Sequence, residues 1–275
     1  KVCETDKTGQ IPVEKGHMSF PKAAMPALSS EPALNSKPAL NSGSILNSNP
    51  ALNSRQEEAV TALDRCVAVI AGPGTGKTKT LISRISHLLD VRRVKPSQIT
   101  AVTFTNKAAA EMKERLSKNR RTRQSLGKMH IGTFHSLCLE LLSGFGMTFT
   151  LADSALTMDI AEAVVSEYGL NMSAGQFLQK VSYMKSQSTA KEEKPARLEN
   201  TSGKAEFKKA FDTYNERLRQ ANALDFDDLL LEAIKACEKE GERPEFNYLL
   251  VDEFQDISPV QYELIKVWNR QGREL

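Results

Sequence analysis

Apolar residues along the middle of the chain alternate between short β-type runs and runs with helical spacing. The pattern predicts strands at 67–71, 99–104 and 129–132, and helices at 78–89, 107–116 and 134–142. In each helix the apolar residues recur at three- and four-residue intervals, which places them on one face. Strands that alternate with helices form parallel sheets, so the chain is predicted to be an α/β protein.

A second part of the chain, residues 151–221, has helical spacing without strand signals. Helices are predicted at 156–168, 174–185 and 205–220, and the polar segment 186–203 is predicted to be a mobile loop. The strand pattern returns at 247–251, and Ser258 followed by Pro259 predicts the start of a last helix that runs to Trp268. We therefore expect a parallel α/β domain interrupted by a helical insertion.

The N-terminal part of the chain carries a hexapeptide repeat and no apolar periodicity. The copies over 31–54 read EPALNS, KPALNS, GSILNS and NPALNS. A short β-helix is the structured alternative, but the prolines favour a flexible linker. Ser54 with Glu57 three residues later predicts a capping box that starts a helix and ends the linker. Residues 1–50 are thus expected to be a disordered linker that joins this domain to an upstream one.

Composition changes this picture little. The 275 residues are 40% hydrophobic and carry a formal net charge of only +3, so any nucleic-acid binding must depend on local patches. The four cysteines lie far apart, which argues against a zinc site or a disulfide framework and indicates a reducing, cytoplasmic setting. No apolar run is long enough to span a membrane, and no signal peptide is indicated.

The glycine-rich segment 71–79, AGPGTGKTK, carries the clearest chemistry. Glycines allow successive backbone N–H groups to face one anion, Lys77 adds charge for the β- and γ-phosphates of a nucleotide, and the Thr78 hydroxyl can ligate Mg²⁺. An ordinary glycine turn between a strand and a helix is the alternative, and Ala71 stands where the strict pattern has glycine. The candidate nucleotide-binding residues here are Ala71, Gly72, Pro73, Gly74, Thr75, Gly76, Lys77, Thr78 and Lys79.

The predicted strand at 247–251 ends in two carboxylates, Asp252 and Glu253. The carboxyl edge of a parallel sheet is where α/β proteins bind ligands. Alone, such a pair is most often a solvated turn. Downstream of a phosphate loop, Asp252 is predicted to hold Mg²⁺ together with Thr78, and Glu253 to orient and deprotonate the water that attacks the γ-phosphate.

Two other strand ends, TFTN at 103–106 and GTFH at 132–135, carry hydroxyls and an aromatic ring. Hydroxyls and helix-start N–H groups suit phosphodiester oxygens, and an exposed Phe suits base stacking. Alternatively, Thr105 and Thr133 only cap helices and the Phe rings belong to the core. The candidate contacts to single-stranded DNA are Thr103, Phe104, Thr105, Asn106, Thr133, Phe134 and His135.

Two charged stretches have simpler explanations. Residues 118–128, KNRRTRQSLGK, contain bases and no acid, and could follow a nucleic-acid backbone, although such a loop is often only solvated. Residues 222–229, NALDFDDL, place acids at a helix start, where the helix dipole is sufficient reason for them.

Five segments in this order resemble the N-terminal motor half of superfamily 1A DNA helicases of the UvrD/PcrA/Rep type. They are AGPGTGKTKTL, AVTFTNKAAAEMKERL, GTFHSLCLELL, NALDFDDLLL and YLLVDEFQDISPVQYELI. The resemblance covers about residues 52–268. It implies a RecA-like P-loop NTPase domain in two parts, 51–148 and 225–275, around a helical 1B subdomain at 149–224, with ATP and Mg²⁺ as cofactors.

The same resemblance assigns roles to individual residues. LNSRQ at 52–56 resembles the family's Q motif, in which Gln56 reads adenine, and Gln255 would sense the γ-phosphate. The catalytic set would then be Lys77, Asp252, Glu253 and Gln255. Ser54 and Lys79 depart from the family pattern, because Pro and an adenine-stacking Arg are common at these positions.

The activity implied is ATP-dependent unwinding of or translocation on single-stranded DNA, with 3′→5′ polarity and with junctions of single- and double-stranded DNA as substrates. The family's third motif and second RecA-like domain, which supplies catalytic arginines, do not occur in these 275 residues, so the chain is interpreted as an inactive half-motor. Three readings stay open: half of a helicase, the ATPase arm of a helicase-nuclease, and a nucleotide-gated DNA-binding module without motor activity.

Overall fold

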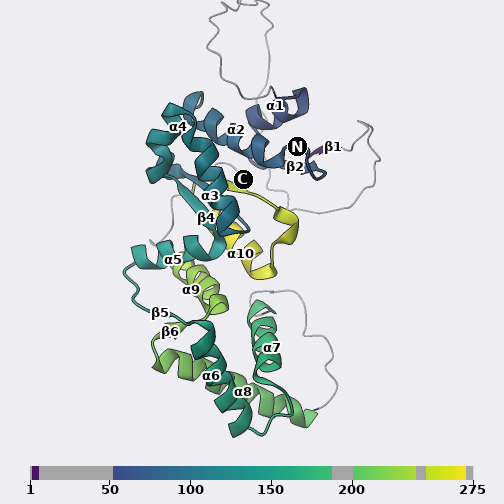
Figure 1. Ribbon diagram of the computed structural model, residues 1–275, viewed down its shortest axis with the longest axis vertical. Helices are drawn as coiled ribbons and strands as arrows, with labels where there is room; N and C mark the ends of the chain where they lie inside the picture. The colour runs from purple at the N-terminus through teal and green to yellow at the C-terminus, as the bar shows by residue number, and fades with distance from the viewer. Residues whose placement is uncertain (1, 6–51, 188–200, 240–245, 271–274) are drawn as a thin grey trace, which may run out of the picture.

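The computed structural model describes residues 2–5, 52–187, 201–239, 246–270 and 275 (Figure 1). Within them the chain folds as a mixed α/β protein, with β1, β2 and β4 in the upper part of the figure and the helices α6, α7 and α8, next to β5 and β6, in the lower part. The elements in chain order are β1 (Val2–Thr5), α1 (Ser54–Thr61), β2 (Ala68–Ala71), α2 (Lys77–Asp90), η1 (Pro96–Gln98), β3 (Ile99–Thr103), α3 (Asn106–Ser117), α4 (Arg120–Ser125), η2 (Leu126–Lys128), β4 (His130–Thr133), α5 (Phe134–Gly144), β5 (Thr150–Leu151), α6 (Ser154–Glu167), α7 (Ala174–Gln187), α8 (Thr201–Gln220), β6 (Ala223–Leu224), α9 (Phe226–Glu238), β7 (Tyr248–Val251), η3 (Phe254–Asp256) and α10 (Pro259–Trp268).

Three parallel strands in the order β4-β3-β7 form the central sheet, which confirms the predicted parallel pairing. All five residues of β3 are buried. In the register of the sheet Thr103 lies opposite Thr133, and Val102 lies opposite Val251. The three strands therefore end at one edge, and the segments that follow them leave the sheet side by side.

Apolar side chains cover both faces of this sheet. On one face Ala101 packs in a cluster with α2 and α3, which contribute Ile85 and Met112. On the other face Val102 packs in a cluster with α5, α9 and α10, whose members include Trp268. Successive strand residues point to opposite faces, so the near-continuous apolar run of a parallel strand is explained by burial on both sides.

Helices α6, α7 and α8 form a separate helical unit with its own core. Its fully buried side chains include Phe177 and Tyr214, which meet edge to face with ring centroids 5.9 Å apart. The two short parallel strands β5 and β6 lie where the chain enters and leaves this unit. The predicted helical insertion is therefore observed as three helices between α5 and α9.

The N-terminus differs from expectation. Residues 1–50 are predicted to be disordered, but Val2–Thr5 form a strand that pairs in parallel with β2. The reason is long-range: β2 offers backbone N–H and C=O groups at its edge, and an extended segment can satisfy them. The hexapeptide repeat at 31–54 lies outside the described residues except for its last three positions.

Three local boundaries also differ. The first helix is capped by Asn53, which forms its capping box with Gln56, so the predicted pair of Ser54 and Glu57 is wrong by one residue. The basic segment at 118–128 contains α4, held by the buried Thr122 hydroxyl, which donates to the Leu116 carbonyl. Helix α8 begins within the predicted loop at 186–203, and residues 188–200 lie outside the described part. Among the described helices, none is both long and apolar enough to cross a membrane.

Candidate functional site

The glycine-rich segment 71–79 links the end of β2 to the start of α2. Gly74 and Gly76 have φ angles of 74° and 89°, the left-handed region that glycine adopts without strain. Gly76 is also the N-cap of α2, and it offers no side chain to occupy the first N–H groups of the helix. The loop therefore presents backbone donors and the positive end of a helix dipole, as a site for an anion requires. Pro73 and Gly74 form its exposed tip.

Lys77 connects this loop to the end of β7. Its ammonium donates to the Ala71 carbonyl at 3.2 Å and lies 3.9 Å from the Glu253 carboxylate. The two side chains are 28% and 39% exposed, so solvent reaches both. Two residues that are 176 positions apart in the sequence (253 − 77) thus lie together, as the sequence predicts.

Helix α1 packs beside the same loop through Gln56. The Gln56 amide donates to the Thr75 carbonyl at 2.9 Å, and the Thr75 hydroxyl donates to the Gly72 carbonyl at 2.7 Å. A Cβ on Gly76 would lie 3.0 Å from the Gln56 amide nitrogen and 3.8 Å from Cβ of Lys79. Gln56 therefore lies at the glycine loop.

The carboxylates after β7 have different surroundings. The Asp252 N–H donates to the Val102 carbonyl at 2.9 Å, which continues the ladder between β7 and β3. Burial raises the pKa of the Asp252 carboxyl, and the neighbouring Glu253 charge adds to this rise. Glu253 has a left-handed φ of 49°, and its carboxylate accepts from the Gln255 amide at 2.7 Å. Glu253 is thus held between Gln255 and Lys77.

Thr78 lies in the first turn of α2 and is partly buried. Among the described residues, no group of three or more His, Cys, Asp and Glu side chains is arranged to hold a metal ion. Asp252 and Thr78 alone are hard oxygen donors of the kind that Mg²⁺ takes when nucleotide phosphates complete its shell. The donor types present therefore fit a magnesium–nucleotide complex better than a permanent protein-bound metal.

The segment after β3 is partly available to a ligand. Phe104 is 56% exposed, and Asn106 is also exposed at the start of α3. The Thr105 side chain caps α3 by accepting from the Ala108 N–H at 3.1 Å. Thr103 differs from the prediction: its side chain is 2% exposed, and its hydroxyl donates to the Thr105 carbonyl. Its side chain is used within the fold and is not available to DNA.

In the segment after β4, too, some predicted residues are used within the fold and one is partly exposed. Thr133 caps α5, where its side chain forms a capping box with Ser136. The prediction that Phe134 contacts DNA is wrong, because the ring is 4% exposed and stacks on Trp268 with centroids 5.9 Å apart. His135 is partly exposed at this edge, and burial lowers the pKa of its imidazole.

Sequence reasoning missed one aromatic residue at this edge. Phe226, the first residue of α9, is 53% exposed and meets the His135 ring edge to face with centroids 5.3 Å apart. The segment around it suggested only a helix start with a favourable dipole. The sequence does contain a signal for it: Phe226 lies next to a helix-capping residue, as do Phe104 and Phe134.

Comparison with known proteins identifies the family. The model for the UvrD/REP helicase N-terminal domain matches residues 52–275. The chain belongs to this family. The match includes the glycine loop, the three strand ends and the helical unit.

Individual relatives agree with this assignment. The chain is 34% identical over 230 residues to a protein named probable DNA helicase II homolog from Mycoplasma capricolum, over 77% of this chain and 31% of that protein. It is 34% identical over 223 residues to the ATP-dependent DNA helicase Rep of Buchnera aphidicola, over 77% and 33%. It is 32% identical over 229 residues to the ATP-dependent DNA helicase PcrA of Staphylococcus aureus, over 78% and 31%. The chain thus spans about a third of the length of these UvrD/REP helicases.

Proposed function

We propose that this chain is the ATP-binding N-terminal half of a DNA helicase or translocase that moves 3′→5′ on single-stranded DNA. The observation that carries the proposal is the approach of Lys77 to Glu253. Hydrolysis of a γ-phosphate needs a cation on the phosphate oxygens and a carboxylate beside the attacking water. The 3.9 Å contact brings the two groups for these tasks to one place.

The proposed mechanism assigns one task to each group. The backbone N–H groups of 72–78 bind the phosphates, and Lys77 moves from Glu253 to the β- and γ-phosphate oxygens. Glu253 then orients the attacking water and takes its proton, while Gln255, which touches Glu253, responds to the γ-phosphate. Gln56 binds the adenine beside the loop. Thr78 and Asp252 would hold Mg²⁺, which would supply positive charge against the phosphate oxygens.

The DNA side of the proposal uses the exposed groups at the ends of β3 and β4 and at the start of α9. Phe104 and Phe226 offer rings for base stacking, and His135 lies against Phe226. Thr105, Asn106 and Thr133 are placed at helix starts, where N–H groups suit phosphodiester oxygens. We propose that α6–α8 are the family's 1B subdomain within a RecA-like domain, and that single-strand/duplex junctions are substrates.

The test measures nucleotide affinity and steady-state phosphate release on this chain and on the longer protein that we propose contains it. Because the chain spans 31% of the PcrA relative, we propose that arginines beyond it complete the charge on the transition state. Loss of an arginine finger lowers the rate by about 10³ to 10⁵. The chain should bind Mg-ATP, and the longer protein should hydrolyse it when single-stranded DNA is added.

Other results of these measurements would favour one of the alternative functions or refute the proposal. Brisk DNA-stimulated phosphate release by this chain alone would show that its catalytic set is complete and would overturn the half-motor proposal. DNA binding that depends on ATP, without DNA-stimulated hydrolysis in the longer protein, would support a nucleotide-gated binding module. Nuclease activity in the longer protein would support a helicase-nuclease. A folded chain with no affinity for Mg-ATP would refute the ATP site.

A further inference from the structure

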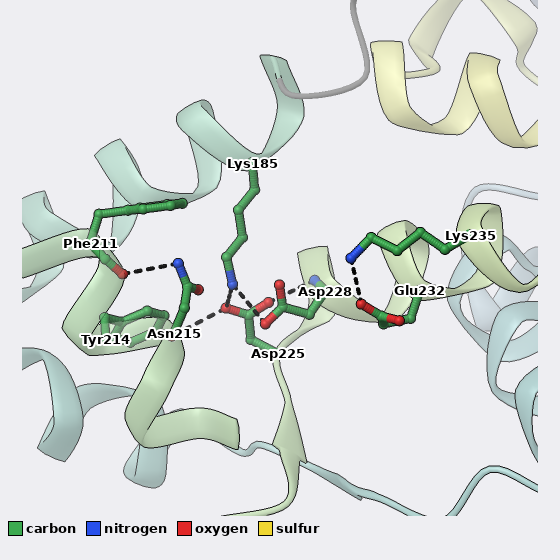
Figure 2. A network of polar contacts seen from close by, with 8 residues as sticks. All are labelled: Lys185, Phe211, Tyr214, Asn215, Asp225, Asp228, Glu232 and Lys235. Carbon is green, nitrogen blue, oxygen red and sulfur yellow. Dashed lines mark hydrogen bonds and ion pairs between the residues drawn. The ribbon is translucent and has the colours of Figure 1, made fainter. Parts of the chain in front are cut away.

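A buried lysine joins the helical unit to the first turn of α9 (Figure 2). Lys185, near the end of α7, is 3% exposed. Its ammonium lies 2.6 Å from a carboxylate oxygen of Asp225 and 2.8 Å from one of Asp228. Tyr214 of α8 donates to the same Asp225 oxygen at 3.3 Å, and its ring lies 5.4 Å from the ammonium. Figure 2 shows the lysine reaching from α7 to the two carboxylates.

Stability is a weak reason for this cluster. Burying a lysine and two carboxylates removes their hydration, and well-packed neutral residues of similar volume are often as stable or more stable. Burial raises the pKa of Asp228, and the Lys185 charge opposes this shift. An arrangement of this kind is better explained by the geometry that it fixes.

The geometry it fixes is the start of α9. Asp225 is the N-cap of this helix: one carboxylate oxygen accepts from the Asp228 N–H at 2.8 Å, and the other binds Lys185. The same carboxyl group therefore starts the helix and ties it to α7. A movement of the Asp225 side chain would therefore change both the cap of α9 and its contact with Lys185.

The next two residues of α9 face the proposed DNA edge. Phe226 meets the His135 ring edge to face at 5.3 Å. Burial raises the pKa of Asp227. A hydrogen bond from Ser182 of α7 and the charge of His135 both act to lower it. The first turn of α9 thus lies between α7 on one side and His135 on the other.

We propose that Lys185 is a positioning residue for single-stranded DNA: by bridging Asp225 and Asp228 it holds the first turn of α9 so that the Phe226 ring stays beside His135. Lys185 itself is buried and acts through these two side chains. The inference rests on the DNA-binding function proposed above, and it gives the helical unit a part in the DNA site through Lys185 of α7.

The experiment compares three variants of the full chain. Lys185→Met leaves two buried carboxylates without this lysine. The triple variant Lys185→Met, Asp225→Asn, Asp228→Asn removes all three charges and keeps a good N-cap, since Asn caps as well as Asp. Lys235→Met is the matched control, because Lys235 also pairs with a carboxylate on α9, that of Glu232 at 2.7 Å, but is 64% exposed. Figure 2 includes this control pair.

Three quantities are measured for each variant: urea unfolding, affinity for a fluorescein-labelled oligothymidylate, and the NMR resonance of the His135 imidazole, assigned with His135→Gln. Lys185→Met should be less stable and should bind DNA less tightly. The triple variant should recover stability, yet still bind the oligonucleotide at least about fivefold less tightly, the lower end of the loss of one base–aromatic stack. Its His135 resonance should shift, because the ring current of Phe226 moves away.

Recovery of stability, DNA affinity and the His135 resonance together in the triple variant would overturn the inference and leave the cluster a purely stabilising role. If the unaltered chain does not bind the oligonucleotide, the proposed function fails. The His135 resonance then still decides the positioning claim, because it reports the contact with Phe226 without DNA. Lys235→Met should leave all three quantities unchanged.

Discussion

The Lys77 ammonium lies 3.9 Å from the Glu253 carboxylate, across the space between the glycine loop and the end of β7. The two residues proposed to act on opposite sides of the γ-phosphate are thus paired with each other. A phosphate that binds Lys77 has to compete with this carboxylate. Loss of the lysine should therefore weaken nucleotide binding, whereas loss of the carboxylate charge should not.

Lys77→Ala should weaken the affinity for Mg-ATP by about tenfold to a hundredfold, as expected when a hydrogen bond to a charged group is lost. Glu253→Gln should keep or increase that affinity, because it removes the competing charge and keeps the shape of the side chain. In the longer protein the same variant should lower DNA-stimulated phosphate release by about 10² to 10⁴, through loss of the general base. Titration with a fluorescent nucleotide and a phosphate-release assay measure the two effects.

Glu263→Gln is the control for this pair, since Glu263 is also a carboxylate paired with a lysine, Lys266 at 2.6 Å on α10. It should change neither quantity. Equal loss of nucleotide affinity in Glu253→Gln and Lys77→Ala would contradict the assigned roles.

Phe104→Ala should weaken binding of single-stranded DNA by about 1–3 kcal/mol and leave nucleotide affinity unchanged, because the exposed ring is proposed to stack on a base. The matched variant is Phe134→Ala. That ring is buried against Trp268, so its loss should lower the free energy of unfolding by about 3–5 kcal/mol. Fluorescence anisotropy and urea unfolding separate the two. An unchanged DNA affinity in folded Phe104→Ala would remove this residue from the site.

Gly76→Ala should damage the nucleotide site in two ways. The residue has a φ of 89°, and a Cβ there would lie 3.0 Å from the Gln56 amide nitrogen. The left-handed conformation alone costs a residue with a Cβ about 1–2 kcal/mol. Gly127→Ala is the control, since nothing lies within 4 Å of a Cβ at that position. Urea unfolding together with nucleotide titration should show losses for Gly76→Ala only, and comparable losses in both variants would refute the steric argument.

His135 should make folding stability depend on pH. Burial lowers the pKa of His135 below its ordinary value of 6.5, with the Asp227 charge opposing this shift. The folded chain then binds fewer protons than the unfolded chain between the two pKa values, so the free energy of unfolding rises with pH across that window. The contribution is complete above 6.5 and is lost as the pH falls through the window.

Urea unfolding at a series of pH values measures this slope. His135→Gln should reduce it, and so should His87→Gln, because burial also lowers the pKa of His87. An unchanged slope in His135→Gln would show that the imidazole is equally solvated in both states.

Much of the sheet could be predicted because its signals are local. The run at 247–251 with two carboxylates after it became β7, and Ser258 with Pro259 starts α10 as expected. The glycine loop also followed from its own residues. Phe104 and Phe134 could not be separated in this way, since both follow a threonine at a strand end. Phe134 belongs to the core because it packs on Trp268 and on other buried residues distant in sequence.

The remaining differences depend on partners far along the chain. The pairing of β1 needs the edge of β2, which lies more than sixty residues later. The acids at 225–228 were explained by the helix dipole, and this explanation is incomplete, because their cation comes from Lys185 on another helix. Neither partner carries a local signal for the other. Such contacts become visible only when the topology is known.

The hydrogen bond from the Asp252 N–H to the Val102 carbonyl has a mechanical consequence. The proposed magnesium ligand is bonded to the backbone two residues before Phe104, so the chemical end and the DNA end of the domain share a peptide ladder about 5 Å wide. We propose that a shift of Asp252 when a phosphate leaves would reach the segment that carries the Phe104 ring through this one hydrogen bond.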